Sequence, residues 1–281
     1  MDSTLDKMPL LSIIIPCYND AAFIEQAVAS ALQQTYKNTE IIIVDDGSNA
    51  ETKAILKTLA PQLQLITQEN KGQSAARNCG VKAASGAYIL VLDSDDYVEH
   101  QFCEMAVKLI NTENVALVTC NALIHSELKD DCIFQPKGGE LSDFLFANQA
   151  LGNCALFRKE DWLQIGGYDE TMRQGWEDWE FYIRLMQLGG RCEVIPEVLF
   201  HYRKRENTTT DKANNQKYEL YKYIFTKHKD LYTNHYEKLV EFLLIKIDQE
   251  EQEKVKNRNR IDFLVGKKIL APFRFIKSKL K

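Results

Sequence analysis

The stretch Tyr88-Ile-Leu-Val-Leu-Asp-Ser-Asp-Asp96 decides the fold class. Its first five residues are apolar or aromatic, which is typical of a strand buried on both faces of a sheet. Three aspartates follow within four residues, so the strand runs directly into a polar segment. These carboxylates repel one another, and their position at the end of a buried strand favours a partner cation.

The same alternation of apolar runs and polar ends continues through the first 120 residues. This order of strands and helices predicts an α/β fold with a mostly parallel sheet covered on both faces. We take Asp20 as the N-cap of the first helix. The predicted strands are Leu10–Ile15, Glu40–Val44, Leu63–Thr67, Tyr88–Leu92 and Val115–Cys120, and the predicted helices are Asp20–Gln34, Glu51–Leu59, Ser74–Ala84 and Val98–Ile110.

Polar clusters follow three of these strands, at Pro16–Asn19, Asp45–Ser48 and Asp93–Asp96. Ligands of parallel sheets bind outside the carboxyl ends of the strands. We therefore expect all three clusters at one edge of the sheet. The segment 120–210 is mixed, with short strands near 153–157, 191–195 and 198–203 and a helix over Trp176–Leu188.

Composition and charge divide the chain further. With 281 residues, 45% hydrophobic and 27% charged, it has an ordinary globular composition. The net charge of −5 argues against a generic nucleic-acid binder. Residues 256–281 carry +8, which leaves −13 on the rest. We predict one α/β domain over 1–210 and a helical extension over 211–281 with a basic tail.

Cysteine usage and the terminus bear on the compartment. The seven cysteines form no C-x-x-C pair, which disfavours a disulfide framework and a zinc site. Residues 1–9 show no apolar core of a signal peptide, and no stretch approaches the roughly 20 apolar residues of a spanning helix. These features favour the cytoplasm.

Two common nucleotide-binding motifs are absent. The turn after the first strand is Pro16-Cys-Tyr-Asn19, without the glycines that a Rossmann dinucleotide site needs. No G-x-x-x-x-G-K-[ST] sequence of a P-loop occurs.

Each acidic segment has a chemical and a structural interpretation. Asp45–Ser48 is either an ordinary turn or a segment whose carboxylate binds a base or ribose. Asp93–Asp96 binds Mg²⁺ or Mn²⁺, or Asp96 caps the next helix. Glu177-Asp178 supplies a general base, or only complements a helix dipole.

In order, the segments match a known family. The chain resembles the family 2 glycosyltransferases, which have the GT-A fold, from about Leu11 to Arg203. The matching motifs are Ser12–Asn19, Val44–Ser48, Asn70–Gly72 with Ala76–Asn78, Asp93–Asp95, Glu177–Asp178 and His201–Arg203.

The resemblance implies a role for each matching position. Asp178 is similar to the family's catalytic base, and Asp95 to the metal ligand that ends its D-x-D motif. Asp96 is a second candidate ligand. His201 reaches the metal or diphosphate, or is a strand histidine in a structural hydrogen bond. The implied donor-binding residues are Pro16, Tyr18 and Asp46 at the base and ribose, Lys71, Gly72 and Arg77 near the nucleotide and diphosphate, Asp93 at the ribose or the donor sugar, and Ser94 in the same motif.

The activity implied is metal-dependent, inverting transfer from a nucleotide-sugar, with UDP as the expected nucleotide, to a glycan or lipid-linked acceptor of bacterial surface-polysaccharide synthesis. The Q-x-x-R-W motif of processive members is missing, which favours a non-processive enzyme. The alternatives are a sugar-nucleotide pyrophosphorylase, which usually has a Gly-rich first loop, and a catalytically silent carbohydrate-binding protein.

The basic tail 256–281 mixes cationic and large apolar residues, as an interfacial segment does. We expect it to bind an anionic membrane and to place the protein peripherally on the inner face of the plasma membrane. A helical cap on the first domain and an oligomer contact remain alternatives, and nucleic acid is disfavoured.

Overall fold

The computed structural model describes all residues except 1–7, 127–129, 206–212, 262, 264, 267, 268 and 271–281. The chain divides into two compact units, Met1–Ile224 and Phe225–Lys281. The first unit extends past residue 210 because Leu220 and Ile224 are buried. The domain boundary predicted at 210 lies outside the described residues.

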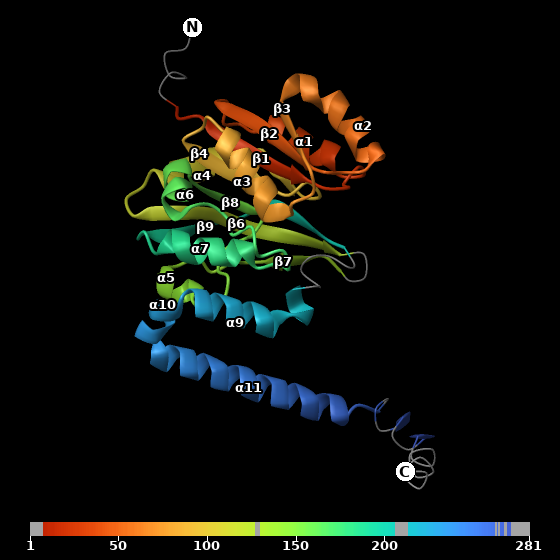
Figure 1. Ribbon diagram of the computed structural model, residues 1–281, viewed down its shortest axis with the longest axis vertical. Coiled ribbons are helices and arrows are strands. Elements are labelled where there is room, and N and C mark those ends of the chain that lie inside the picture. Colours follow the sequence, from red (N-terminus) through yellow and green to blue (C-terminus); the bar gives the residue numbers. More distant parts are fainter. Residues whose placement is uncertain are drawn as a thin grey trace. The chain divides into compact units, whose positions relative to one another are not determined.

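One sheet forms the frame of the first unit (Figure 1). Its order in the described chain is β3-β2-β1-β4-β8-β6-β9-β5, and β7 pairs with β6. The strands are β1 Leu11–Cys17, β2 Thr39–Asp46, β3 Gln64–Gln68, β4 Tyr88–Leu92, β5 Tyr97–Val98, β6 Val115–Ser126, β7 Cys132–Phe134, β8 Cys154–Arg158 and β9 Arg191–Lys204.

The first four long strands are parallel, as their apolar runs predict. β2 lies between β1 and β3, and β4 lies on the other side of β1. The sheet then becomes mixed, because β8 is antiparallel to both β4 and β6. The predicted α/β fold with a mostly parallel sheet is confirmed, and its β1, β2 and β4 ends lie at one edge.

Helices cover this sheet and also form the second unit. In the described residues, α9 crosses the boundary between the units, and α10 and α11 belong to the second. The helices are α1 Ile24–Leu32, α2 Ala50–Leu59, the 3₁₀ turn η2 Ala60–Gln62, α3 Gln73–Ala83, α4 Phe102–Ile110, α5 Leu141–Phe144, α6 Lys159–Ile165, α7 Glu177–Met186, α9 Lys217–Lys227, α10 Lys229–Asn234 and α11 Tyr236–Arg258.

The core lies on both faces of β1, in which every residue is buried. Successive strand residues point to opposite faces. Ile13 and Ile15 belong to a cluster with Val28 of α1 and Phe102 of α4. On the opposite face α3 approaches so closely that a Cβ on Gly80 would lie 2.4 Å from Ile14 Cγ2. The two layers of helices hold the strand ends in place.

Two sequence predictions of local structure were wrong. The first helix begins at Ile24, and the Asp20 side chain makes no cap because it binds residues of the functional site. Two short strands were expected near 191–203, whereas β9 is one strand of 14 residues. Its bulge is stabilised by the Asn121 amide, which donates to the Pro196 carbonyl at 2.5 Å.

The cysteines are all free, and five of the seven are buried. Cys79 is half-buried and Cys132 is exposed. No disulfide links any of them.

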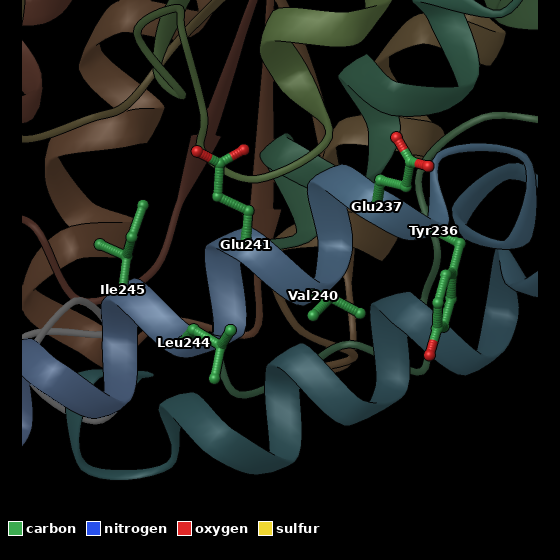
Figure 2. Close-up of a pocket in the computed structure, with 6 residues that line it drawn as sticks. All are labelled: Tyr236, Glu237, Val240, Glu241, Leu244 and Ile245. Carbon is green, nitrogen blue, oxygen red and sulfur yellow. The ribbon is translucent and has the colours of Figure 1, made fainter.

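In the second unit, α11 has no buried residue. A shallow depression runs along one side of this helix (Figure 2), lined by Tyr236, Glu237, Val240, Glu241, Leu244 and Ile245. Within the described residues, no helix combines the length and the apolar character needed to cross a bilayer.

Candidate functional site

The predicted meeting of polar segments at the sheet edge is confirmed for all three strand ends. The backbone N–H of Asn19, after β1, donates to Ser48 Oγ, after β2, at 3.1 Å. The Ser94 hydroxyl after β4 donates to Asp20 Oδ2 at 2.6 Å. These hydrogen bonds connect the ends of β1, β2 and β4 into one polar surface.

Asp46 organises the loop between β3 and α3. Its carboxylate accepts the backbone N–H groups of Lys71 and Gly72, both at 2.8 Å, and the Gln68 amide at 2.7 Å. Gly72 has φ +94°, a conformation that side chains disfavour, so a glycine suits this turn. In this structure Asp46 therefore positions Lys71 and Gly72, and its carboxylate contacts the loop itself.

The other predicted donor-binding residues of β1 differ in exposure. Pro16 is buried within the strand, whereas the Tyr18 side chain is 50% exposed just beyond it. Lys71 is exposed, and its carbonyl accepts Arg173 Nε at 3.1 Å. Tyr18 and Lys71 are thus the members of this set that can contact a ligand through their side chains.

Arg77 joins two acidic segments that are far apart in the sequence. This guanidinium, only 2% exposed, donates to Asp93 Oδ1 at 3.0 Å and to Glu177 Oε1 at 2.7 Å. Gln73, one turn earlier on α3, donates to both oxygens of Asp93 at 3.0 Å. Helix α3 therefore orients Asp93 and the start of α7 together.

Asp93, Asp95 and Asp96 form an acidic cluster, with one carboxylate oxygen of each within 4.8 Å of the others. Asp96 is fully buried, and its carboxylate accepts the backbone N–H of Arg203 at 2.8 Å and the Asn153 amide. Asp95 is less enclosed and binds the Arg205 guanidinium. Asp95 and Asp93 are therefore the more accessible ligands.

The electrostatics of the cluster favour an added cation. The pKa of Asp95 is raised to about 6, chiefly by burial and also by the Asp93 charge, while Arg205 opposes the shift. Burial and the two neighbouring aspartates also raise the pKa of Asp96 well above its ordinary value. Carboxylate oxygens are the ligands that Mg²⁺ and Mn²⁺ prefer, so these side chains fit such an ion.

His201 does not join the acidic cluster. One ring nitrogen lies 2.8 Å from Glu99 Oε1 and the other 3.0 Å from a ring nitrogen of His125. The ring also stacks on Tyr97 with centroids 4.2 Å apart. In this structure both ring nitrogens are engaged by residues of β6 and the β5–α4 loop, which is the arrangement of the structural alternative, a strand histidine in hydrogen bonds.

Asp178 lies in the first turn of α7. The Asn148 amide donates to its Oδ2 at 2.7 Å, and Gly152 leaves the space that this carboxylate occupies. Burial raises the pKa of Asp178, with Arg77 opposing the shift. A carboxylate with a raised pKa is a better proton acceptor, which is what general-base catalysis needs.

The tryptophans beside Asp178 are held by protein contacts. Trp179 is buried, and its indole N–H donates to the Phe144 carbonyl at 2.6 Å. Trp176 packs edge-on against Trp179 and Tyr221 and has φ +62°. They form an aromatic support at the start of α7.

Sequence reasoning missed several residues that hold the site. Asn148, Gly152 and Asn153 lie in a segment without a recognisable pattern. Arg205 had a usable signal, because alternate residues of a strand share a face and His201 and Arg203 precede it at that spacing.

The amino-acid sequence matches two family profiles and several known proteins. The profile described as Glycosyl transferase family 2 matches residues 12–160, and the one described as N-terminal domain of galactosyltransferase matches residues 144–208. An uncharacterized glycosyltransferase of Rickettsia prowazekii is 32% identical over 85% of this chain and 76% of its own. The Escherichia coli chondroitin synthase is 29% identical over 79% of this chain but only 33% of its own.

Solved structures resemble the fold at low identity. TarS 1-349 of Staphylococcus aureus, crystallised with UDP, superposes with a TM-score of 0.58, 20% identity, and coverage of 69% of this chain and 60% of its own. The mannosyltransferase PcManGT of Pyrobaculum calidifontis, in complex with GDP-Man and Mn²⁺, superposes with a TM-score of 0.57 and 20% identity. The match covers 74% of this chain and 60% of that chain.

Proposed function

Since this chain belongs to glycosyl transferase family 2 and is a glycosyltransferase of the GT-A fold, we propose that it moves a sugar from a nucleotide-sugar to a hydroxyl group with inversion of configuration. The observation that carries the proposal is the Arg77 bridge. It connects Asp93, at the start of the acidic cluster, to Glu177, the neighbour of Asp178. One buried cation thus connects the carboxylates that we assign to the metal ion with the helix start that carries the proposed general base.

Asp95 and Asp93 would hold a Mn²⁺ or Mg²⁺ ion that neutralises the leaving diphosphate. The accessibility of Asp95 and the full enclosure of Asp96 support this choice of ligands. Tyr18, Lys71 and Gly72 line the neighbouring strand ends and would contact the nucleotide. Asp46 then acts by positioning the Lys71–Gly72 backbone.

In the transfer step, the Asp178 carboxylate takes the proton of the acceptor hydroxyl. The acceptor oxygen attacks the anomeric carbon from the face opposite the diphosphate, and the bond to the diphosphate oxygen breaks. One displacement inverts the configuration, so no second carboxylate nucleophile is needed, unlike in retaining glycoside hydrolysis.

UDP is the nucleotide that we propose, and a growing polysaccharide or lipid-linked glycan is the acceptor. The TarS likeness, seen with UDP, and the chondroitin synthase relative support these choices. We place the protein at the inner face of the plasma membrane, with residues 256–281 on anionic lipid, because of the charge of that segment.

Thermal stabilisation by UDP-sugars and GDP-mannose, each with and without Mn²⁺, tests the donor and the metal together. We expect one UDP-sugar to raise the melting temperature by several degrees only when Mn²⁺ is present. In Asp95→Ala this stabilisation should disappear. In Asp178→Asn it should persist, while transfer to a glycan acceptor falls by about two to four orders of magnitude.

Three results would contradict the assignment. Stabilisation that is independent of Mn²⁺ would remove the metal role of Asp95. Wild-type transfer by Asp178→Asn would remove the base. Release of diphosphate from a sugar phosphate and a nucleoside triphosphate would indicate the pyrophosphorylase alternative.

A further inference from the structure

Arg205 occupies the cation position of the acidic site. Its guanidinium donates to Asp95 Oδ2 and, at 3.1 Å, to Asp20 Oδ1. The second oxygen of Asp20 accepts Ser94 Oγ at 2.6 Å, so Arg205 closes a link between the ends of β1 and β4. Within the described residues, it is the side-chain cation paired with Asp95.

The neighbouring arginines are built in differently. Arg77 lies on α3, is buried and binds two carboxylates. Its guanidinium therefore cannot move away without breaking both ion pairs. Arg203 binds Asp96 through its backbone N–H, and its side chain donates to the Asp95 carbonyl and to Gln26. Neither of these two guanidinium groups binds the Asp95 carboxylate.

Arg205, by contrast, is placed to move. It follows the last residue of β9, and its side chain is 35% exposed. Its Nε is buried and has no hydrogen-bond partner among the described residues, so this guanidinium is incompletely satisfied where it lies. Its guanidinium also lies over the Phe23 ring, 5.0 Å from the ring centroid.

We propose that Arg205 is a resident counter-cation of Asp95 and Asp20, and that a divalent cation must displace it to bind Asp95. This inference rests on the metal site of the proposed function. A divalent cation on the Asp95 carboxylate would lie within a few ångströms of the Arg205 guanidinium, and two cations so close repel each other strongly. The affinity of the donor-free protein for metal is therefore lowered by Arg205, which links loading of the metal to movement of this side chain.

Direct metal binding tests the exchange without any activity measurement. Mn²⁺ is titrated into the full chain at pH 8 and 0.15 M salt, without nucleotide, and the free aqua ion is measured by electron paramagnetic resonance. We expect Arg205→Gln to bind Mn²⁺ about three- to fivefold more tightly than wild type, because the loss of a partly exposed ion pair changes an equilibrium constant by up to about that factor. Arg205→Lys, which keeps a charge, should stay near wild type.

Lys204→Gln is the matched control, because Lys204 is exposed and the substitution changes the net charge equally. Its affinity should change less than twofold, since long-range effects are screened at this salt. Thermal unfolding verifies that each variant is folded. Equal or weaker binding by folded Arg205→Gln overturns the exchange, as does the same gain in Lys204→Gln. Absence of Mn²⁺ binding in every variant overturns the metal site itself.

Discussion

Arg77 is the residue on which the geometry of the site depends most. It is buried, and its two carboxylate partners, the first residue after β4 and the first residue of α7, lie 16 and 100 residues away in the sequence. A buried charge is stable only when it is paired, and the same holds for each partner. This triad therefore contributes to both folding and site geometry.

We expect Arg77→Ala to lower the free energy of unfolding by about 3–5 kcal/mol, because Asp93 and Glu177 lose their shared cation. Urea denaturation measures the change. Lys108→Ala is the control, since the Lys108–Glu104 pair is exposed and screened by solvent and should contribute much less. A loss as small as that of the control would show that Arg77 is dispensable for folding.

Asp178 should determine the acid limb of the pH–rate profile. Its pKa is raised by burial, so the basic form is lost as pH falls through a value above that of an ordinary aspartate. We expect kcat/KM to decline on the acid side at a higher pH than about 4. The Asn148 amide stabilises the charged form, so Asn148→Ala should move the limb to still higher pH. An unchanged limb in this variant would contradict the assignment to Asp178.

At the scale of elements, the segment between α5 and β8 supports α7. Asn148 donates to Asp178, and Gly152 lies beneath the same carboxylate. A loop can serve this purpose because its ends are held by buried residues on either side, Phe144 and Cys154.

Gly152→Ala should displace the proposed base. The added Cβ would lie 2.1 Å from Asp178 Oδ2, so the carboxylate must move. We expect kcat to fall at least about tenfold while donor binding, measured by calorimetry, stays unchanged. Gly266→Ala is the control, since a Cβ there meets no atom within 4 Å. Full activity of Gly152→Ala would show that the position of this carboxylate is not critical.

The parallel strands and their helices were predictable because each carries its own apolar period. The role of Asp20 was not predictable from the sequence. Its side chain binds Ser94 and Arg205 instead of capping the first helix, and these two residues reach it only in the folded chain. The length of β9 also depends on its partner β6, which extends to Ser126.

For the whole molecule, the charge is divided between a body at −13 and the segment 256–281 at +8. The exposed apolar residues of this segment include Ile261, Phe263 and Val265. Basic residues near anionic lipid contribute about 1 kcal/mol each, and the proposal that this segment binds such a surface rests on that attraction.

Flotation with anionic vesicles tests the membrane proposal. We expect the full chain to float with anionic vesicles and a 1–255 truncation to remain at the bottom. With neutral vesicles, neither protein should float. Lys267→Gln with Lys268→Gln should weaken binding by about tenfold or more, because two charges are lost. Equal flotation of the full and truncated chains would contradict the membrane proposal. Sedimentation of both chains would then test whether the segment makes an oligomer contact.

The sequence by itself determined the α/β fold, the edge at which the polar segments meet and the residue types there, because apolar period and strand-end polarity are local properties. The tertiary structure alone decided which acid is accessible and which cation each one binds. Asp95 and Asp96 are neighbours in sequence, yet one pairs with Arg205 and the other is enclosed by Asn153 and the Arg203 backbone. Burial and ion pairing depend on contacts between distant residues, and no local pattern encodes them.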